Sequence, residues 1–197
     1  MGLFEFLSFV LIFQIFILLN PLDSFPLLIS AHKKKMNVRA IAYKSVIIAF
    51  ILALVIVFIG PFLFNLFGIS LDSFRVAGGI ILFLLGLSMV QSEEDYSEVG
   101  SVDGMISLIA TPLLTGPAVI SFITIKTYEI GKIAILTNLF FAFLIVAVLF
   151  ILLSYSVDKI NEKIINILSK VLGLFLTAVA IEMIVKGVLG LFKIGLI

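Results

Sequence analysis

The chain has 197 residues, of which 62% are hydrophobic and only 13% are charged, and its mean hydropathy is +1.35. Soluble domains carry about 25% charged residues, so this chain is too apolar to cover a water-facing surface but can cover a lipid-facing one. The net charge of +1 gives no indication of a nucleic-acid partner, and the absence of cysteine excludes disulfides, thiolate catalysis and cysteine–metal sites. These properties predict an integral membrane protein.

Long apolar runs alternate with short polar islands along the chain. A hydrocarbon core about 30 Å thick needs roughly 20 apolar residues per helix, and the runs lack the period-two alternation of barrel strands. We therefore expect an all-α membrane fold, one domain over residues 1–197, in the lipid bilayer of the plasma (inner) membrane. The six expected spans cover residues 2–32, 40–67, 74–91, 104–129, 132–157 and 166–192.

The polar connections predict an orientation, because lysine and arginine are enriched in cytoplasmic loops. The strongest basic island follows the first span, and residues 92–103 form an acidic linker. With both termini outside, eight basic residues are cytoplasmic and five are outside, so we expect that arrangement. The cytoplasmic set is Lys33, Lys34, Lys35, Arg39, Lys44, Lys159, Lys163 and Lys170, and the outer set is Arg75, Lys126, Lys132, Lys186 and Lys193.

An internal match divides the chain into two halves. Residues 20–30 align without gaps to residues 111–121, at a constant offset of 91. Four of the five prolines form two Pro-x4-Pro pairs in this alignment, namely Pro21 with Pro26 and Pro112 with Pro117. Each half, residues 1–91 and 104–197, contains three spans, so the second half must enter the membrane from the opposite side. This predicts an inverted-topology repeat, which many secondary transporters use for alternating access.

Both matched stretches lie inside apolar spans, and their prolines predict broken helices. A proline removes a backbone donor and biases the preceding residue away from the helical region. Unwound backbone survives at membrane depth only beside protein or water. The two half-helix N-termini would present free N–H groups and positive dipole ends, which suit a carboxylate. The predicted substrate-binding residues are Asn20, Pro21, Asp23, Ser24, Thr111, Pro112, Thr115, Gly116 and Pro117.

Ser24 and Thr115 are expected to cap the half-helices that follow, with Pro26 and Pro117 in the first turns. On this basis each half would carry the same local arrangement: an unwound stretch, a hydroxyl cap and a proline-started helix. The depths of the two breaks disagree, however. At 1.5 Å per residue, Asn20 lies about 27 Å into the first span and Thr111 about 10 Å into the fourth. Span 1 must therefore start outside the hydrocarbon, tilt strongly or be partly re-entrant.

Two acidic residues inside spans are candidates for ion coupling, because ionisable groups are costly in lipid. Asp23 could meet a substrate ammonium, carry a proton or only cap its own half-helix. A structural Asp23 would weaken the first half-helix as an anion site, which favours Thr115 and Gly116 for a carboxylate. Glu182 is the second candidate, although an ordinary pair with Lys186 four residues later is the simpler interpretation. Gly79 and Gly86, seven apart in span 3, are expected to permit close helix packing.

The motifs resemble those of the MarC family of integral membrane proteins, over essentially the whole chain. They are residues 20–26, 76–83 and 112–121, in the family's order. The family includes the small neutral amino acid transporter SnatA, so the resemblance implies transport of substrates such as glycine, alanine or threonine. Asp23 stands where the family's first motif usually has glycine, Ala118 where the second often has glycine, and Glu182 where glutamine is common.

The sequence therefore leads to a secondary transporter of small neutral amino acids, in which Asn20, Asp23 or Thr111 takes the ammonium. The alternative is a channel or facilitator for another small polar solute. An enzyme is not expected, because no Ser–His pair, metal-ligand cluster or phosphate loop is present. No cofactor is expected, and uptake or export, proton or sodium coupling and homo-oligomer formation are left open.

Overall fold

The computed structural model describes residues 7–22, 24–91, 101–156 and 162–194, and these ranges contain helices and short connections but no strand. Of the predicted linker, residues 92–100 lie outside the described ranges, as does Asp23. In chain order the helices are α1 (Phe9–Leu19), α2 (Phe25–Lys33), α3 (Val38–Phe67), α4 (Leu71–Gln91), α5 (Val102–Leu108), the π-helical turn η2 (Ile109–Leu114), α6 (Pro117–Ile130), α7 (Lys132–Ser156) and α8 (Glu162–Ile194).

Four of these helices, α3, α4, α7 and α8, are long and apolar enough to cross a membrane. They correspond to the second, third, fifth and sixth predicted spans. The first and fourth predicted spans are instead each divided into shorter pieces, α1 with α2 and α5 with η2 and α6. The prediction of an all-α membrane protein is confirmed.

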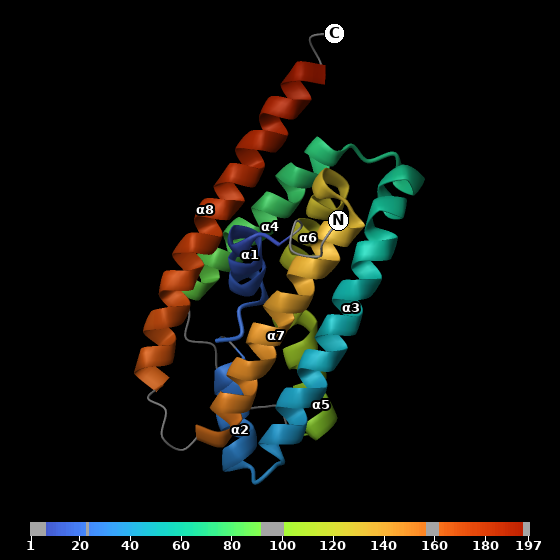
Figure 1. Ribbon diagram of the computed structural model, residues 1–197. Coiled ribbons are helices and arrows are strands. Elements are labelled where there is room, and N and C mark those ends of the chain that lie inside the picture. Colours follow the sequence, from blue (N-terminus) through green and yellow to red (C-terminus); the bar gives the residue numbers. More distant parts are fainter. Residues whose placement is uncertain (1–6, 23, 92–100, 157–161, 195–197) are drawn as a thin grey trace.

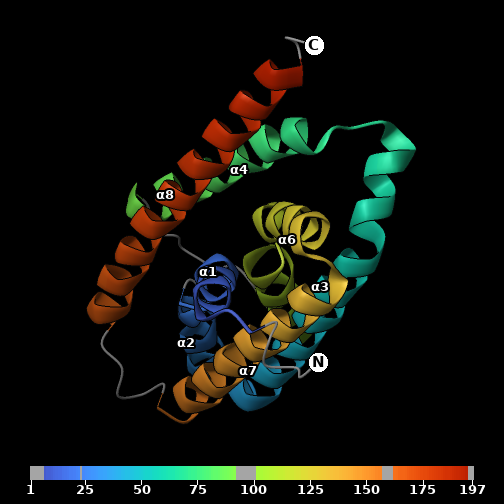
Figure 2. The ribbon, with the colours of Figure 1, turned by 45° about the horizontal axis from the view of Figure 1, so that its top comes forward.

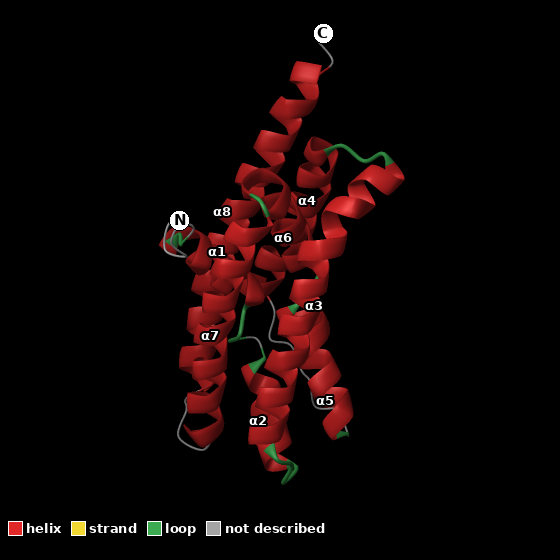
Figure 3. Ribbon diagram, turned by 45° about the vertical axis from the view of Figure 1, so that its right-hand side comes forward, coloured by secondary structure: helices red, strands yellow, loops and turns green. Residues whose placement is uncertain are grey.

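The long helices pack in two pairs, with the short pieces between them (Figures 1 and 2). Helix α4 lies along α8 and α3 lies against α7, while α1 packs on α7 and α6 packs on both α3 and α4. In Figure 1, α1 and α6 occupy the upper half of the molecule and α2 and α5 the lower half, and Figure 3 shows the same division. The divided segments therefore form the centre of the structure.

Part of the inner face of α3 is built from small and medium-sized side chains. On α3, Ala49, Ala53 and Val57 are fully buried at helical spacing, whereas Ile51 and Phe58 are about half exposed. Because lipid is as apolar as leucine, helices in a bilayer associate through close van der Waals contact, which small residues allow. The exposed large side chains are then the lipid-facing surface.

The contact between α4 and α8 is the closest example of this packing. A Cβ atom placed on Gly86 would lie 2.8 Å from the carbonyl oxygen of Gly173, and one on Gly79 would lie 2.9 Å from that of Ala180. A Cβ atom on Gly173 would in turn lie 2.9 Å from the Gly86 carbonyl. The expectation that Gly79 and Gly86 serve close packing is confirmed.

The first helix among the described residues begins later than the predicted first span, which shortens the distance from the helix start to its break. Helix α1 begins at Phe9, where the Ser8 side chain accepts a hydrogen bond from the Leu11 amide and the Ser8 amide donates to Asn138 Oδ1 at 2.8 Å. Asn20 therefore lies about 16 Å along the helix axis from Phe9, and Thr111 lies about 14 Å from the start of α5. Both breaks now fall at comparable distances from the ends of their segments.

Candidate functional site

The first helix break is centred on Asn20, directly after α1. Asn20 has φ 42° and ψ 60°, the left-handed conformation that ends many helices and that asparagine tolerates better than most residues. Its side chain is buried, and Nδ2 donates to Met89 Sδ of α4 at 3.3 Å. Pro21 follows in a turn, and α2 resumes at Phe25 with a proline in its first turn, as predicted.

Ser24 occupies the position of the α2 cap, but the predicted capping hydrogen bond is absent. Its backbone is helical, with φ −77° and ψ −12°, so its side chain does not reach back to the first-turn amides as an extended cap residue does. The side chain is completely buried, and Oγ has no hydrogen-bond partner among the described residues. A buried hydroxyl is normally hydrogen-bonded. The Ser24 hydroxyl, which has no hydrogen-bond partner among the described residues, therefore lies at the N-terminal end of a half-helix.

The second break is centred on Thr111, inside η2. Thr111 has φ −151° and ψ 111°, an extended conformation within an otherwise helical stretch. Pro112 is the physical cause, because its ring clashes with the preceding residue in the helical region. Thr111 is exposed despite its position in the middle of the divided segment. Helix α6 then begins at Pro117, with the proline in the first turn as predicted.

The prediction that Thr115 caps α6 is wrong. The Thr115 hydroxyl is buried and donates to the carbonyl of Ala49 on α3 at 3.1 Å, so it holds the break against a neighbouring helix. Gly116 is the cap residue of α6 and forms no side-chain cap. Its φ of −80° and ψ of 177° are accessible to any residue. What glycine contributes here is therefore the absence of a side chain, which leaves the first-turn amides of α6 without a capping acceptor.

The two breaks lie beside each other in the middle of the molecule. Helix α1 contacts η2 and α6, and α2 contacts α5. Helices α1 and α5 approach the centre from opposite ends, and α2 and α6 leave it toward opposite ends (Figures 1 and 3). The structure thus brings the N-terminal ends of two antiparallel half-helices to the same level. Asp23 is the one predicted site residue for which no structure is described.

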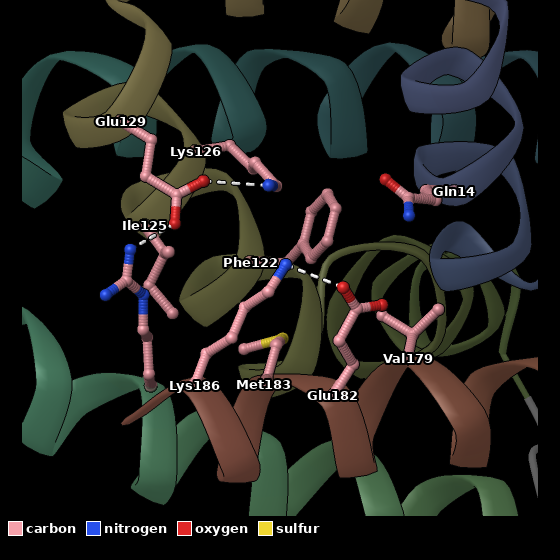
Figure 4. A pocket seen from close by; sticks show the side chains of 10 residues that line it. Gln14, Phe122, Ile125, Lys126, Glu129, Val179, Glu182, Met183 and Lys186 are labelled. Carbon is pink, nitrogen blue, oxygen red and sulfur yellow. Dashed lines mark hydrogen bonds and ion pairs between the residues drawn. The ribbon is translucent and has the colours of Figure 1, made fainter. Parts of the chain in front are cut away.

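A second polar feature was not predicted from the sequence. A pocket between α1, α4, α6 and α8 encloses about 80 Å³ and combines opposite charges with apolar walls (Figure 4). Its lining residues are Gln14, Arg75, Phe122, Ile125, Lys126, Glu129, Val179, Glu182, Met183 and Lys186. One part of this pocket could have been predicted from the sequence. Lys126 and Glu129 are three residues apart near the end of a span, a spacing that allows an ion pair on one helix face.

One ion pair of this pocket, between Arg75 and Glu129, joins two helices. The Arg75 guanidinium donates to Asp72 on its own helix at 2.5 Å and to Glu129 of α6, and Lys126 pairs with the other Glu129 oxygen at 2.8 Å. These side chains are no more than 27% exposed. Arg75 and Glu129 therefore connect α4 to the C-terminal end of α6, where Lys126 also pairs with Glu129.

Glu182, the second ion-coupling candidate, pairs with Lys186 at 2.6 Å within α8, as the simpler interpretation expected. Both side chains are more than half exposed, at the rim of the pocket. Among the described residues, no group of three or more His, Cys, Asp or Glu side chains could hold a metal ion. Glu182 is thus one partner of an exposed ion pair within α8.

Long apolar helices, two broken segments and lipid-facing large side chains define an integral membrane protein with interrupted spans. The family model described as MarC family integral membrane protein matches residues 5–192. The chain therefore belongs to the MarC family, which confirms the resemblance found in its motifs.

Curated relatives agree with this assignment. The chain is 35% identical to a UPF0056 membrane protein of Methanocaldococcus jannaschii, over 92% of this chain and 96% of the relative. It is 31% identical to the UPF0056 membrane protein YhcE of Escherichia coli, over 95% of this chain and 96% of the relative. It is 30% identical to a UPF0056 membrane protein of Aquifex aeolicus, over 89% of this chain and 89% of the relative. No solved structure matches the chain.

Proposed function

We propose that this protein is a secondary transporter that moves small neutral amino acids, of the glycine, alanine and threonine class, across the plasma membrane by alternating access. The observation that carries the proposal is the presence of two half-helix N-termini, at Ser24 and Gly116, on the divided segments that lie between the long helices. Helix N-termini bind anionic groups through free amides and the helix dipole. Transporters place such discontinuous helices at the substrate site near the bilayer midplane.

In this proposal the substrate carboxylate is held by the first-turn amides of α6, which receive no side-chain cap from Gly116. The unused hydroxyl of Ser24 supplies a further hydrogen bond from the opposite half. Asn20, Asp23 and Thr111 are the groups proposed to receive the ammonium. Pro21, Pro112 and Pro117 act through the backbone, because they hold the two breaks open.

Packing between the halves supports an inverted repeat. The second predicted span packs on the fifth, as α3 on α7, and the third packs on the sixth, as α4 on α8. The first contacts the fourth through α1 with η2 and α6, and through α2 with α5. Each predicted span thus contacts its counterpart span in the other half, which is the arrangement expected around a two-fold axis in the membrane plane. Rocking of one half against the other would expose the central breaks to each side in turn.

Transport by purified protein in liposomes tests this function. Uptake of radiolabelled glycine or alanine should saturate with concentration and should be suppressed by excess unlabelled substrate. A linear, non-competed flux would instead establish the channel or facilitator alternative. Protein-free liposomes and liposomes with a heat-denatured sample give the background rate.

Asp23→Asn tests ion coupling at the first break. If Asp23 carries a proton or binds sodium during transport, the substitution should remove the dependence of uptake on the imposed proton or sodium gradient, while expression stays normal. Asp103→Asn is the matched control, because Asp103 is an exposed carboxylate in the first turn of α5 and is not one of the predicted site residues. An unchanged gradient dependence in Asp23→Asn would remove Asp23 from the coupling mechanism.

The predicted orientation can be measured directly, because the chain has no native cysteine. Ile69 is exposed between α3 and α4, and Lys34 is exposed after α2, at the other end of the bundle. With both termini outside, Ile69→Cys should react with a membrane-impermeant maleimide on intact cells, whereas Lys34→Cys should react only after permeabilisation. The reverse labelling pattern would show that the termini are cytoplasmic.

A further inference from the structure

The charged pocket lies alongside α6, further along this helix than its start at Pro117. Phe122 lies about 8 Å along the α6 axis from Pro117, where the half-helix starts, and Glu129 lies about 18 Å along it. Phe122 is buried and contributes to the apolar inner wall, whereas Glu182 and Lys186 stand more than half exposed at the rim. The buried wall of the pocket is therefore the part nearest to the half-helix end at which the carboxylate is proposed to bind, and the ion pair of Glu182 and Lys186 is the exposed part.

The charges around this pocket are balanced and alternate in sign. Arg75, Lys126 and Lys186 carry three positive charges, and the carboxylates paired with them, Asp72, Glu129 and Glu182, carry three negative charges. Figure 4 shows Lys126 and Glu129 from α6 and Glu182 and Lys186 from α8 facing one space, with Gln14 of α1 at its side. A solute with a single charge would pair with one side chain of an ion pair and leave the other side chain of that pair without a partner. Keeping an unpaired charge away from water costs free energy.

A zwitterion can enter such a set without leaving a charge unpaired. Its carboxylate can accept hydrogen bonds from the ammonium groups of Lys126 and Lys186, while its own ammonium donates to Glu129 and Glu182. The Phe122 ring, which already faces the Lys126 ammonium at 5.8 Å, adds a surface that attracts cations. Gln14 offers both a donor and an acceptor to either group.

We propose that this pocket is a vestibule that binds a zwitterionic amino acid before it reaches the central breaks. The proposal rests on the proposed transport function and specifies its recognition step. Binding here selects solutes that carry both charges, and it occurs only from the membrane face at which Ile69 and the end of α6 lie.

The test compares transport from the two faces of the membrane, with the orientation in liposomes read from the accessibility of Ile69→Cys. Glu129→Gln and Lys126→Gln should each raise the half-saturating glycine concentration about fivefold when glycine is supplied from the Ile69 face. Supplied from the opposite face, glycine should show the wild-type value. Lys132→Gln is the control, since Lys132 lies at the same end of the molecule, over the Phe58 ring, and does not line the pocket.

Competitors provide the second measurement. Unlabelled alanine should compete with glycine from the Ile69 face, whereas acetate and methylammonium, each with one of the two charges, should not. The vestibule is rejected if the two substitutions act equally from both faces, if neither changes the half-saturating concentration, or if acetate competes as well as alanine. Absence of any saturable glycine transport in the wild type would instead reject the proposed function itself.

Discussion

Gly116→Leu should abolish amino-acid transport. The φ and ψ of Gly116 suit any residue, so the change adds a side chain over the first turn of α6 without straining the backbone. That side chain would separate a bound carboxylate from the amides that receive it. Loss of two charge-assisted hydrogen bonds, at about 1.5–3 kcal/mol each, corresponds to at least about a 100-fold loss of affinity. Binding of labelled alanine and uptake into liposomes measure the effect.

Two controls separate loss of the site from loss of the fold. Ala178→Leu adds bulk at an exposed position of α8 and should leave both uptake and thermal stability unchanged. Gly116→Ala adds only a methyl group and should bind with intermediate affinity. If Gly116→Leu retains near wild-type affinity, the carboxylate does not bind at the start of α6.

Gly86→Leu should give the largest loss of stability. A Cβ atom at this position would lie 2.8 Å from the carbonyl oxygen of Gly173 and 3.0 Å from the backbone nitrogen of Thr177. These are backbone atoms, so α4 and α8 must separate to admit the side chain. Overpacking of this kind costs about 3 kcal/mol, which lowers the thermal midpoint by about 6–12 °C in a chain of this size. Thermal unfolding of the detergent-solubilised protein measures the shift.

Two further variants, measured by the same thermal unfolding experiment, show whether the effect depends on the contact between α4 and α8. Gly173→Leu addresses the other side of the contact, where a Cβ atom would lie 2.9 Å from the Gly86 carbonyl, and should show a similar shift. Ala77→Leu, at an exposed position of the same helix, should unfold at the wild-type temperature. Equal midpoints for Gly86→Leu and Ala77→Leu would mean that α4 and α8 do not depend on this contact.

Several features follow from local chemistry and could be read from the sequence. Hydropathy identified α3, α4, α7 and α8, because a helix that crosses lipid needs a long apolar run whatever its neighbours are. The prolines identified both breaks, because a proline restricts its own backbone and that of the preceding residue wherever it occurs. Thr111 is extended for that reason alone. The role of Gly79 and Gly86 in packing also followed from their spacing.

Other features depend on partners that lie far away in the chain. Thr115 has the right residue type and position for a cap, yet its hydroxyl bonds to Ala49, 66 residues earlier in the chain. Helix α1 starts at Phe9 beside the contact of Ser8 with Asn138, 130 residues later. The charged pocket depends on Arg75 meeting Glu129, 54 residues apart.

The sequence by itself therefore determined that this is a membrane protein of broken and unbroken helices, and where the breaks fall. Tertiary structure decided which polar groups at those breaks are used and which remain available. Gly116 and Ser24 remain available, Thr115 does not, and Arg75 joins α4 to α6. The physical reason is that backbone restriction acts within one or two residues, whereas a hydrogen bond goes to whichever acceptor the packed helices bring within reach.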